Sequence, residues 1–324
     1  MSLHRWINDG LMAVFFLVIG LEVKREMIQG ELSSKTQASL PIAAALGGML
    51  VPALIYWVFN LGGNGARGWG IPMATDIAFV MGVLTLLGKR VPPSLKIFLL
   101  ALAIVDDLGA VLVIGLFYSS QISWISLGIG LGVLGALGGL NRLGFERPIL
   151  YLFGGLIIWF AFLHSGIHPT ISGVLLAFVL PLQAGQKLER RLQSWGSFGI
   201  MPIFALANAG VALDGATLLN PISIGIIMGL VLGKQIGITL FSWMNIRLGW
   251  SRLPPNLTWR NLYGASCLGG IGFTMSIFIS SLAFGNQAVL STAKVAVFAA
   301  SAISAAWGLS LLFFSLPKRR KPLT

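Results

Sequence analysis

The sequence predicts an all-α membrane protein that crosses the bilayer many times. Hydrophobic residues make up 56% of the 324 residues and charged residues only 10%, a composition more apolar than that of soluble domains. The hydrophobic residues form long runs, and a helix of about 20 such residues is enough to cross a bilayer. Lys and Arg collect in the short segments between the runs, as they do in polytopic membrane proteins.

Taken in order along the chain, the apolar runs predict about eleven membrane-spanning helices. No long polar segment separates these runs, so we expect residues 1–324 to form a single transmembrane domain without a soluble catalytic module. The expected spans are Trp6–Val23, Ala38–Asn60, Ile71–Gly88, Leu95–Tyr118, Ile122–Leu140, Ile149–Leu163, Ile167–Leu182, Phe198–Leu213, Ile222–Ile246, Leu262–Phe284 and Val289–Leu316.

The basic residues orient these helices, because cytoplasmic loops carry the excess of Lys and Arg. With residue 1 outside, only Arg5 and Arg67 fall outside, while Lys234 and Lys294 lie within spans and the other basic residues fall inside. This predicts a multi-pass protein of the bacterial inner membrane, with its N-terminus outside and its C-terminus in the cytoplasm. The net charge of +12 is then a topology signal, and the basic tail Lys318–Lys321 a topogenic stop beside the lipid bilayer. We expect no nucleic-acid partner.

The first span is short, since only Gly10–Leu21 is free of charge. A secretory signal peptide carries its positive charges before the apolar run, whereas here the stronger cluster, Glu22-Val-Lys24-Arg25-Glu26, follows it. We therefore expect an uncleaved helix. By spacing alone, Asp9, Glu22 and Lys294 lie near span ends and can extend toward water.

The glycines of the fifth span predict close packing of helices. The spacings Gly128-x-Gly130-x-Gly132 and Gly135-x-x-Gly138-Gly139 belong to a chain with 41 glycines. Small residues let helix backbones approach closely in a membrane.

The third and tenth spans contain features that interrupt a helix. A proline, a threonine and Asp76 enter the third span at residues 71–77, and three glycines and Thr274 enter the tenth at residues 268–274. Non-helical backbone at membrane depth is tolerated only where it is buried in protein or lines a wet cavity. Paired interruptions in two parts of a chain therefore predict the binding site of a transporter.

The fourth and ninth spans contain charges far from their ends. Asp106 and Asp107 lie side by side in Leu95–Tyr118, and Lys234 lies in the middle of Ile222–Ile246. Together with Asp76, four central charges cost about 10 kcal/mol of insertion energy, so such residues usually mark an ion, proton or substrate path.

Seven motifs in this order resemble the NhaA-type sodium/proton antiporters. The resemblance extends from residue 6 nearly to the tail, and it is carried by Ile7–Phe16, Gly20–Glu26, Ala74–Asp76, Ala103–Gly109, Phe204–Gly210, Gly233-Lys234 and Gly270–Ser276. It implies an inverted-repeat fold in which spans within residues 38–118 mirror spans within residues 222–316. Two discontinuous helices would then cross near the membrane midplane.

The resemblance also assigns residues. It implies that Asp106 and Asp107 are the centre of ion exchange, that Lys234 pairs with Asp106, and that Asp76 balances the crossed helix ends. The interrupted backbone would be at Thr75 and at Gly270, Gly272, Phe273 and Thr274, and a cytoplasmic pH-sensing mouth would comprise Asp9, Glu22, Lys24, Arg25 and Glu26.

The activity implied by the resemblance is secondary antiport of cytoplasmic Na+, and of Li+, for external protons. This exchange would be regulated by pH, electrogenic and used in sodium and pH homeostasis, with no cofactor and no enzymatic reaction. Hard cations take oxygen ligands such as carboxylates, which also bind protons. Adjacent residues lie about 100° apart on a helix, so we expect Asp107 to be the main Na+ ligand and Asp106 and Lys234 to be a proton-linked pair.

Two departures from the family pattern accompany this resemblance. By this resemblance, Met1 corresponds to the start of the family's second helix. Either the start codon was placed late, or the first helix and the outer hairpin, through which family members form a homodimer, are missing. The histidine that members can carry before the eighth span is replaced by the run Leu192-Gln193-Ser194-Trp195. The resemblance therefore predicts pH-dependent activity without specifying its set point.

Two other classes of protein are compatible with buried carboxylates. An intramembrane aspartyl protease uses two Asp residues on different helices, which Asp76 and Asp106 could provide, but the sequence has no Gly-x-Gly-Asp motif. A sodium-coupled solute symporter of similar architecture would bind its substrate at the interrupted helices. Peptide cleavage without ion flux would indicate the protease, and sodium-driven solute uptake the symporter.

Overall fold

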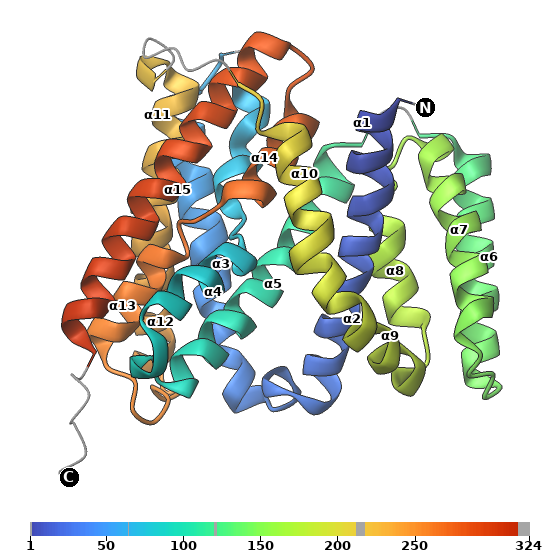
Figure 1. Cartoon of the computed structure of the whole chain (residues 1–324), viewed down its shortest axis with the longest axis horizontal. Coiled ribbons are helices and arrows are strands. Elements are labelled where there is room, and N and C mark those ends of the chain that lie inside the picture. Colours follow the sequence, from blue (N-terminus) through green and yellow to red (C-terminus); the bar gives the residue numbers. More distant parts are fainter. Residues whose placement is uncertain (1, 64, 120–121, 212–217, 317–324) are drawn as a thin grey trace. The chain divides into compact units, whose positions relative to one another are not determined.

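The computed structural model describes residues 2–63, 65–119, 122–211 and 218–316. The basic tail Lys318–Lys321 and the end of the expected span Phe198–Leu213 lie outside these residues. Every element in the described part of the chain is a helix (Figure 1), as the composition predicts.

The helices follow one another with short connections, and η denotes 3-10 or π-helical segments. In chain order they are α1 Leu3–Arg5, η1 Trp6–Leu11, α2 Met12–Gln29, η2 Glu31–Ser33, α3 Lys35–Phe59, η3 Ala66–Met73, α4 Ile77–Leu86, η4 Gly88–Arg90, α5 Pro93–Phe117, α6 Trp124–Arg142, α7 Pro148–Ser165, α8 Ile171–Val179, α9 Leu182–Trp195, η5 Gly196–Ile200, α10 Met201–Asn208, α11 Pro221–Met228, η7 Gly229–Gly233, α12 Lys234–Arg247, α13 Trp259–Leu268, α14 Phe273–Ala283 and α15 Gln287–Ser315.

Seven helical stretches of the described chain are long and apolar enough to cross a membrane, or nine if two bent pairs each count as one span. This makes the protein polytopic, but it does not confirm the expected count of eleven. The two other expected spans, Ile167–Leu182 and Phe198–Leu213, contain the short helices α8 and α10.

The first helix is longer than expected, because it runs without a break from Leu3 to Gln29. The charged residues at positions 22–26 are therefore part of a helix and do not follow its end. Their side chains have polar partners within the protein. The helix can therefore continue past Val23 although these residues are charged.

The two predicted interruptions are present. Segment η3 and α4 form one bent pair, with an angle of 40°, and α13 and α14 form the other, with an angle of 46°. The breaks fall at residues 74–76 and 269–272, within the stretches that the proline, the polar residues and the glycines marked.

The chain divides into two compact units, which we describe separately. The first unit comprises Met1–Gly30 and Leu108–Gly210, and the second comprises Glu31–Asp107 and Val211–Thr324. Both bent pairs belong to the second unit, as do most of the spans that the inverted repeat would relate. The repeat symmetry itself stays a prediction.

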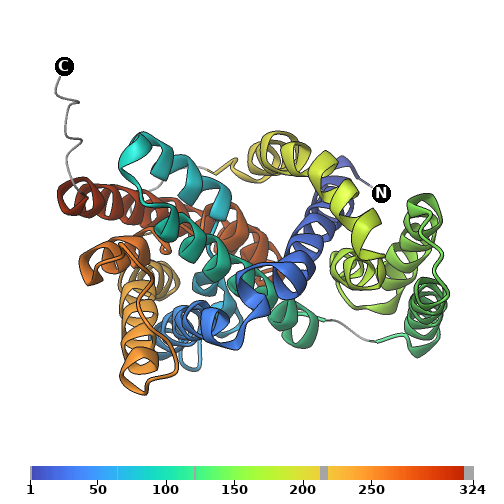
Figure 2. The ribbon, with the colours of Figure 1, turned by 90° about the horizontal axis from the view of Figure 1, so that it is seen from below.

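In the first unit, α2 packs on α8, and α6 and α7 lie side by side (Figures 1 and 2). Buried residues such as Leu17, Tyr151 and Phe162 form its core. The expectation of close packing holds at Gly130 and Gly138 of α6, where a Cβ would lie 2.9 Å from Phe162 and 3.1 Å from Val179. It is wrong at the other four named glycines, because a Cβ at Gly128, Gly132, Gly135 or Gly139 would meet open space.

In the second unit, α3 packs along α12 and α13 packs along α15 (Figures 1 and 2). The tightest approach is between Gly47 and Gly237. A Cβ on Gly47 would lie 2.2 Å from Gly237 O, and one on Gly237 would lie 2.0 Å from Gly47 O. Only glycine permits this approach, which brings Lys234, one turn before Gly237, against α3.

Candidate functional site

The two helix breaks of the second unit contact each other. Asp76 N donates to Ile271 O at 2.7 Å, and Ser276 Oγ donates to Ile71 O at 2.8 Å. Backbone groups released by one break are thus satisfied by the other, as buried polar groups require. This contact joins segments that are about 200 residues apart in sequence.

Asp76 lies at the N-termini of both second half-helices. Its Oδ1 accepts from Phe79 N at 3.2 Å and so caps α4. Its Oδ2 accepts from Thr274 N at 3.1 Å and from the Thr274 hydroxyl in α14. Because the N-terminus of a helix carries a partial positive charge, both ends stabilise this carboxylate, which is 1% exposed.

Asp106 forms an ion pair with Lys234, and both side chains have 0% exposure. The Oδ2 of Asp106 accepts from Lys234 Nζ and also lies 2.7 Å from the Thr75 hydroxyl. The same hydroxyl lies 2.8 Å from Gly269 O. Since a hydroxyl has one proton, Thr75 donates to Asp106 or to Gly269 O at any one time. The ion pair is therefore connected to both helix breaks.

Asp107 is the next residue of α5 and is 3% exposed. Successive residues are about 100° apart on a helix, so its carboxylate leaves α5 in another direction from that of Asp106. The site thus has four charged side chains, Asp76, Asp106, Asp107 and Lys234, each at most 3% exposed.

Glycine is required at the second break by close contacts. A Cβ on Gly270 would lie 2.4 Å from both Leu230 O and Ser304 Oγ, and one on Gly272 would lie 2.2 Å from Ser276 Oγ. Leu230 belongs to the π-helical segment η7, directly before Lys234. Such single-turn π-segments are frequent at functional sites.

The oxygen atoms here are of the kind that a hard cation prefers. They include the carboxylates of Asp106 and Asp107, the Thr75 hydroxyl and the Gly269 carbonyl. Among the described residues, Asp106 Oδ1 has no hydrogen-bond partner. A buried carboxylate oxygen without a protein donor is suited to hold a proton or a cation. Among the described residues, no group of three or more His, Cys, Asp or Glu side chains is arranged to hold a metal ion.

The residues expected in a pH-sensing mouth belong to the first unit, and the structure brings three of them together. Arg25 bonds Glu26 at 2.6 Å and Glu189 at 3.0 Å, and lies 3.9 Å from Glu22. Glu189 was missed by the sequence analysis, although it is an acidic residue amid the basic residues of α9. It is 5% exposed and completes a cluster of three carboxylates around one guanidinium.

The other two residues of the expected mouth have different partners. Lys24 Nζ donates to Phe178 O at 2.8 Å and to Leu180 O, at the C-terminal end of α8. Asp9 lies about 20 Å along the helix from the Arg25 cluster. It faces His168 at 3.7 Å.

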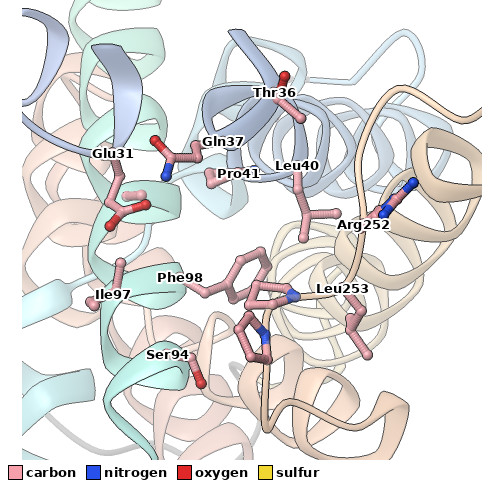
Figure 3. A pocket seen from close by; sticks show the side chains of 13 residues that line it. Glu31, Thr36, Gln37, Leu40, Pro41, Ser94, Ile97, Phe98, Arg252 and Leu253 are labelled. Atoms are coloured by element: carbon pink, nitrogen blue, oxygen red, sulfur yellow. The ribbon is translucent and has the colours of Figure 1, made fainter. Parts of the chain in front are cut away.

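A pocket of about 420 Å³ in the second unit lies elsewhere (Figure 3). It is lined by the first turns of α3 and α5 and by residues 252–255, and Figure 3 shows Glu31 and Arg252 on opposite sides of it. The pocket-lining residues of α5, such as Phe98 and Ala101, lie on one face of this helix. Since successive residues of a helix are rotated by about 100°, Asp106 and Asp107 lie on other faces of α5. The candidate site is therefore the buried cluster at the breaks and not this pocket.

Apolar helices with two mutually bonded breaks around buried charges define the class of secondary transporters. The particular family follows from sequence comparison: the chain belongs to the Na+/H+ antiporter 1 family, which it matches over residues 1–312. Members of this family are transporters and not enzymes.

Three relatives show the extent of the similarity. The Na+/H+ antiporter NhaA 1 of Clostridium beijerinckii is 51% identical over 96% of this chain and 81% of the relative. The Na+/H+ antiporters NhaA of Pectobacterium carotovorum and Vibrio cholerae are each 50% identical, over 98% and 99% of this chain and 83% and 87% of their own lengths.

Proposed function

We propose that this chain exchanges cytoplasmic Na+, and also Li+, for external protons across a bacterial inner membrane. The names of the relatives support this activity. The observation that carries the proposal is the fully buried pair of Asp106 and Lys234, bonded through Thr75 to the second helix break. Charges are costly at membrane depth and usually serve transport there.

Competition for carboxylate oxygens would couple the two ions. Asp107 is the main Na+ ligand in this proposal, and Asp106 with Lys234 exchanges protons. When Asp106 takes a proton its attraction for Lys234 weakens, and the Thr75 hydroxyl can donate to Gly269 O instead. Proton binding thereby changes the contact between the ion pair and the helix break.

Antiport requires that the site changes its facing only when it is loaded with one of the two ions. Two carboxylates, Asp106 and Asp107, then release protons when a single Na+ binds, so net charge moves in each cycle and the exchange is electrogenic.

We further propose that the Arg25 cluster in the first unit regulates the exchange by pH. Its three carboxylates surround a single cation, so its charge depends on proton binding.

Everted membrane vesicles that contain this chain and a pH-sensitive dye would test the exchange. Addition of Na+ should dequench the dye, and more strongly as pH rises. Asp107→Asn should abolish the signal, because the amide cannot carry the charge that balances Na+. The exposed Glu146 provides a matched control, and Glu146→Gln should behave as the wild type. Substantial Na+-driven proton flux in Asp107→Asn would overturn the assignment of Asp107.

The same vesicles distinguish the proposal from a sodium-coupled symporter. Dequenching without any added organic solute supports antiport. Absence of a signal from correctly inserted protein, together with Na+-driven uptake of an organic solute, would replace antiport with symport.

A further inference from the structure

Helix α15 contacts the whole length of the second break through one face. Ser301, Ser304 and Gly308 are spaced i, i+3 and i+7, so they lie on one side of this continuous helix. A Cβ on Gly308 would lie 2.9 Å from Leu268 N, Ser304 Oγ lies against Gly270, and Ser301 Oγ accepts from Phe273 N at 3.1 Å. α15 thus contacts the chain at three points along the break, Leu268, Gly270 and Phe273.

The hydrogen bond from Phe273 is an N-terminal cap supplied by another helix. The first N–H groups of a helix have no partner within it and are usually satisfied by the N-cap side chain. The N-cap of α14 is Gly272, which has no side chain for this purpose. Instead, Phe273 N donates to Ser301 and Thr274 N donates to Asp76. The two neighbouring donors are thus divided between α15 and the ion site.

The aromatic ring of Phe273 also contacts α15, as well as α4. Its centroid lies 4.3 Å from that of Phe79 in α4 and 5.4 Å from that of Phe298 in α15. Phe298 precedes Ser301 by three residues, one turn of α15. Both the backbone and the side chain of Phe273 therefore contact α15, while Phe79 connects the same point to the half-helix that begins at Asp76.

From these contacts we propose that Ser301 is a positioning residue for ion exchange. The backbone bonds of α13 end with the one from Ile271 N to Leu268 O, and those of α14 start with the one from Ser276 N to Gly272 O, so no continuous ladder fixes the rotation of α14 relative to α13. Ser301 sets it by holding Phe273 N, which directs the N–H and hydroxyl of Thr274 to Asp76. Without this acceptor, Phe273 N would compete for Asp76 or stay unsatisfied, and the charge balance at the crossed helix ends would change. This inference rests on the proposed exchange function.

The first test compares Na+-driven exchange in vesicles with wild type, Ser301→Ala, Ser301→Thr and Ser310→Ala. Ser310 is an exposed serine on the same helix, and its hydroxyl donates to Ala306 O, one turn earlier in α15. Loss of one hydrogen bond corresponds to a change of about fivefold, so Ser301→Ala should raise the apparent KM for Na+ about fivefold. Ser301→Thr retains the hydroxyl, so its apparent KM for Na+ should be close to that of the wild type. Ser310→Ala should leave the apparent KM unchanged.

A second measurement separates positioning from a loss of stability. If Ser301 acts through Thr274, then Ser301→Ala should raise KM less in a Thr274→Val background than in the wild type, because that background has already lost the hydroxyl contact with Asp76 and keeps only the N–H contact. Full additivity of the two changes, or an unchanged KM in Ser301→Ala, would overturn the proposal.

Amide hydrogen exchange provides a readout that does not depend on transport. Peptides covering residues 273–275 should exchange faster in Ser301→Ala than in wild type, and equal rates would refute the positioning role. If wild-type vesicles show no Na+/H+ exchange, the proposed function fails while this measurement still decides whether Ser301 holds α14.

Discussion

Removing the lysine of the buried ion pair should destabilise the protein strongly. The change Lys234→Met keeps an apolar side chain of similar length and deletes the charge. Lys234 and Asp106 both have 0% exposure, so Asp106 cannot turn to solvent for compensation. Breaking a buried pair by removal of one partner costs about 3–5 kcal/mol, because an uncompensated charge is left behind.

The structure limits how far the site can adapt. In the described part of the chain, the Thr75 hydroxyl is the other donor to Asp106, and a neutral hydroxyl offers less stabilisation than an ammonium group. For a chain of 324 residues, at about 2.1 cal/mol/K of unfolding entropy per residue, a loss of about 3–5 kcal/mol corresponds to a decrease in Tm of roughly 4–7 °C. Replacing both charges should recover much of this loss, since a buried pair itself contributes little net stability.

Thermal unfolding of purified protein in detergent would measure the effect, with wild type, Lys234→Met, Asp106→Asn and the double variant. Lys294→Met is the matched control, because Lys294 also lies in a long apolar helix, is 8% exposed, and makes no ion pair in the described part of the chain. The double variant should be more stable than Lys234→Met. A double variant whose Tm loss is the sum of the two single losses would refute this account of the pair.

Three other predictions concern exchange and packing. The apparent KM for Na+ should fall as pH rises, because fewer carboxylates then hold a proton. The decrease should be up to about tenfold per pH unit for each competing proton. A constant KM between neutral and alkaline pH in vesicles would contradict competition at one site. Arg25→Ala removes the cation shared by three carboxylates and makes the cluster more negative, so the pH–activity profile should move to higher pH. Arg25→Lys keeps the positive charge and should move the profile less, and an unchanged profile in Arg25→Ala would remove the cluster from regulation. Gly237→Ala would place a Cβ 2.0 Å from Gly47 O and should lower the free energy of unfolding by about 1–3 kcal/mol or more. Gly132→Ala places its Cβ in open space and should not lower it. Equal Tm values for the two variants would show that the approach of α3 and α12 is not tight.

Local sequence features predicted the helix breaks well. The proline at position 72, two residues before the first break, removes a backbone donor, and glycines at positions 269, 270 and 272 weaken the helix at the second break. Both breaks therefore follow from residues that lie in them or directly beside them. The helical class and the many membrane crossings follow in the same way from composition and run length. These properties depend on nearest neighbours along the chain, which the sequence displays directly.

Packing of the glycine-rich helix α6 shows where such local reasoning fails. Its spacings are those of tightly packed helices, yet a Cβ at Gly132 or Gly135 would meet open space, whereas Gly47 and Gly237 in other helices touch. Spacing indicates that a helix could approach a partner closely. It does not indicate which partner is present.

For the candidate site, too, residue types and helix packing provide different information. The residue types alone identify Asp76, Asp106, Asp107 and Lys234 as costly charges inside apolar spans, because the insertion cost depends on each residue and its neighbours in the chain. The roles given to them came from a family resemblance.

Which atoms meet depends on how the helices pack. The Thr75 hydroxyl lies between Asp106 and Gly269 O, Asp76 caps α14 as well as α4, and Ser301 supplies a cap from α15. The physical reason is that these bonds join residues from 28 to 198 positions apart. Their formation depends on how whole helices pack, and no local pattern of residue types specifies that packing.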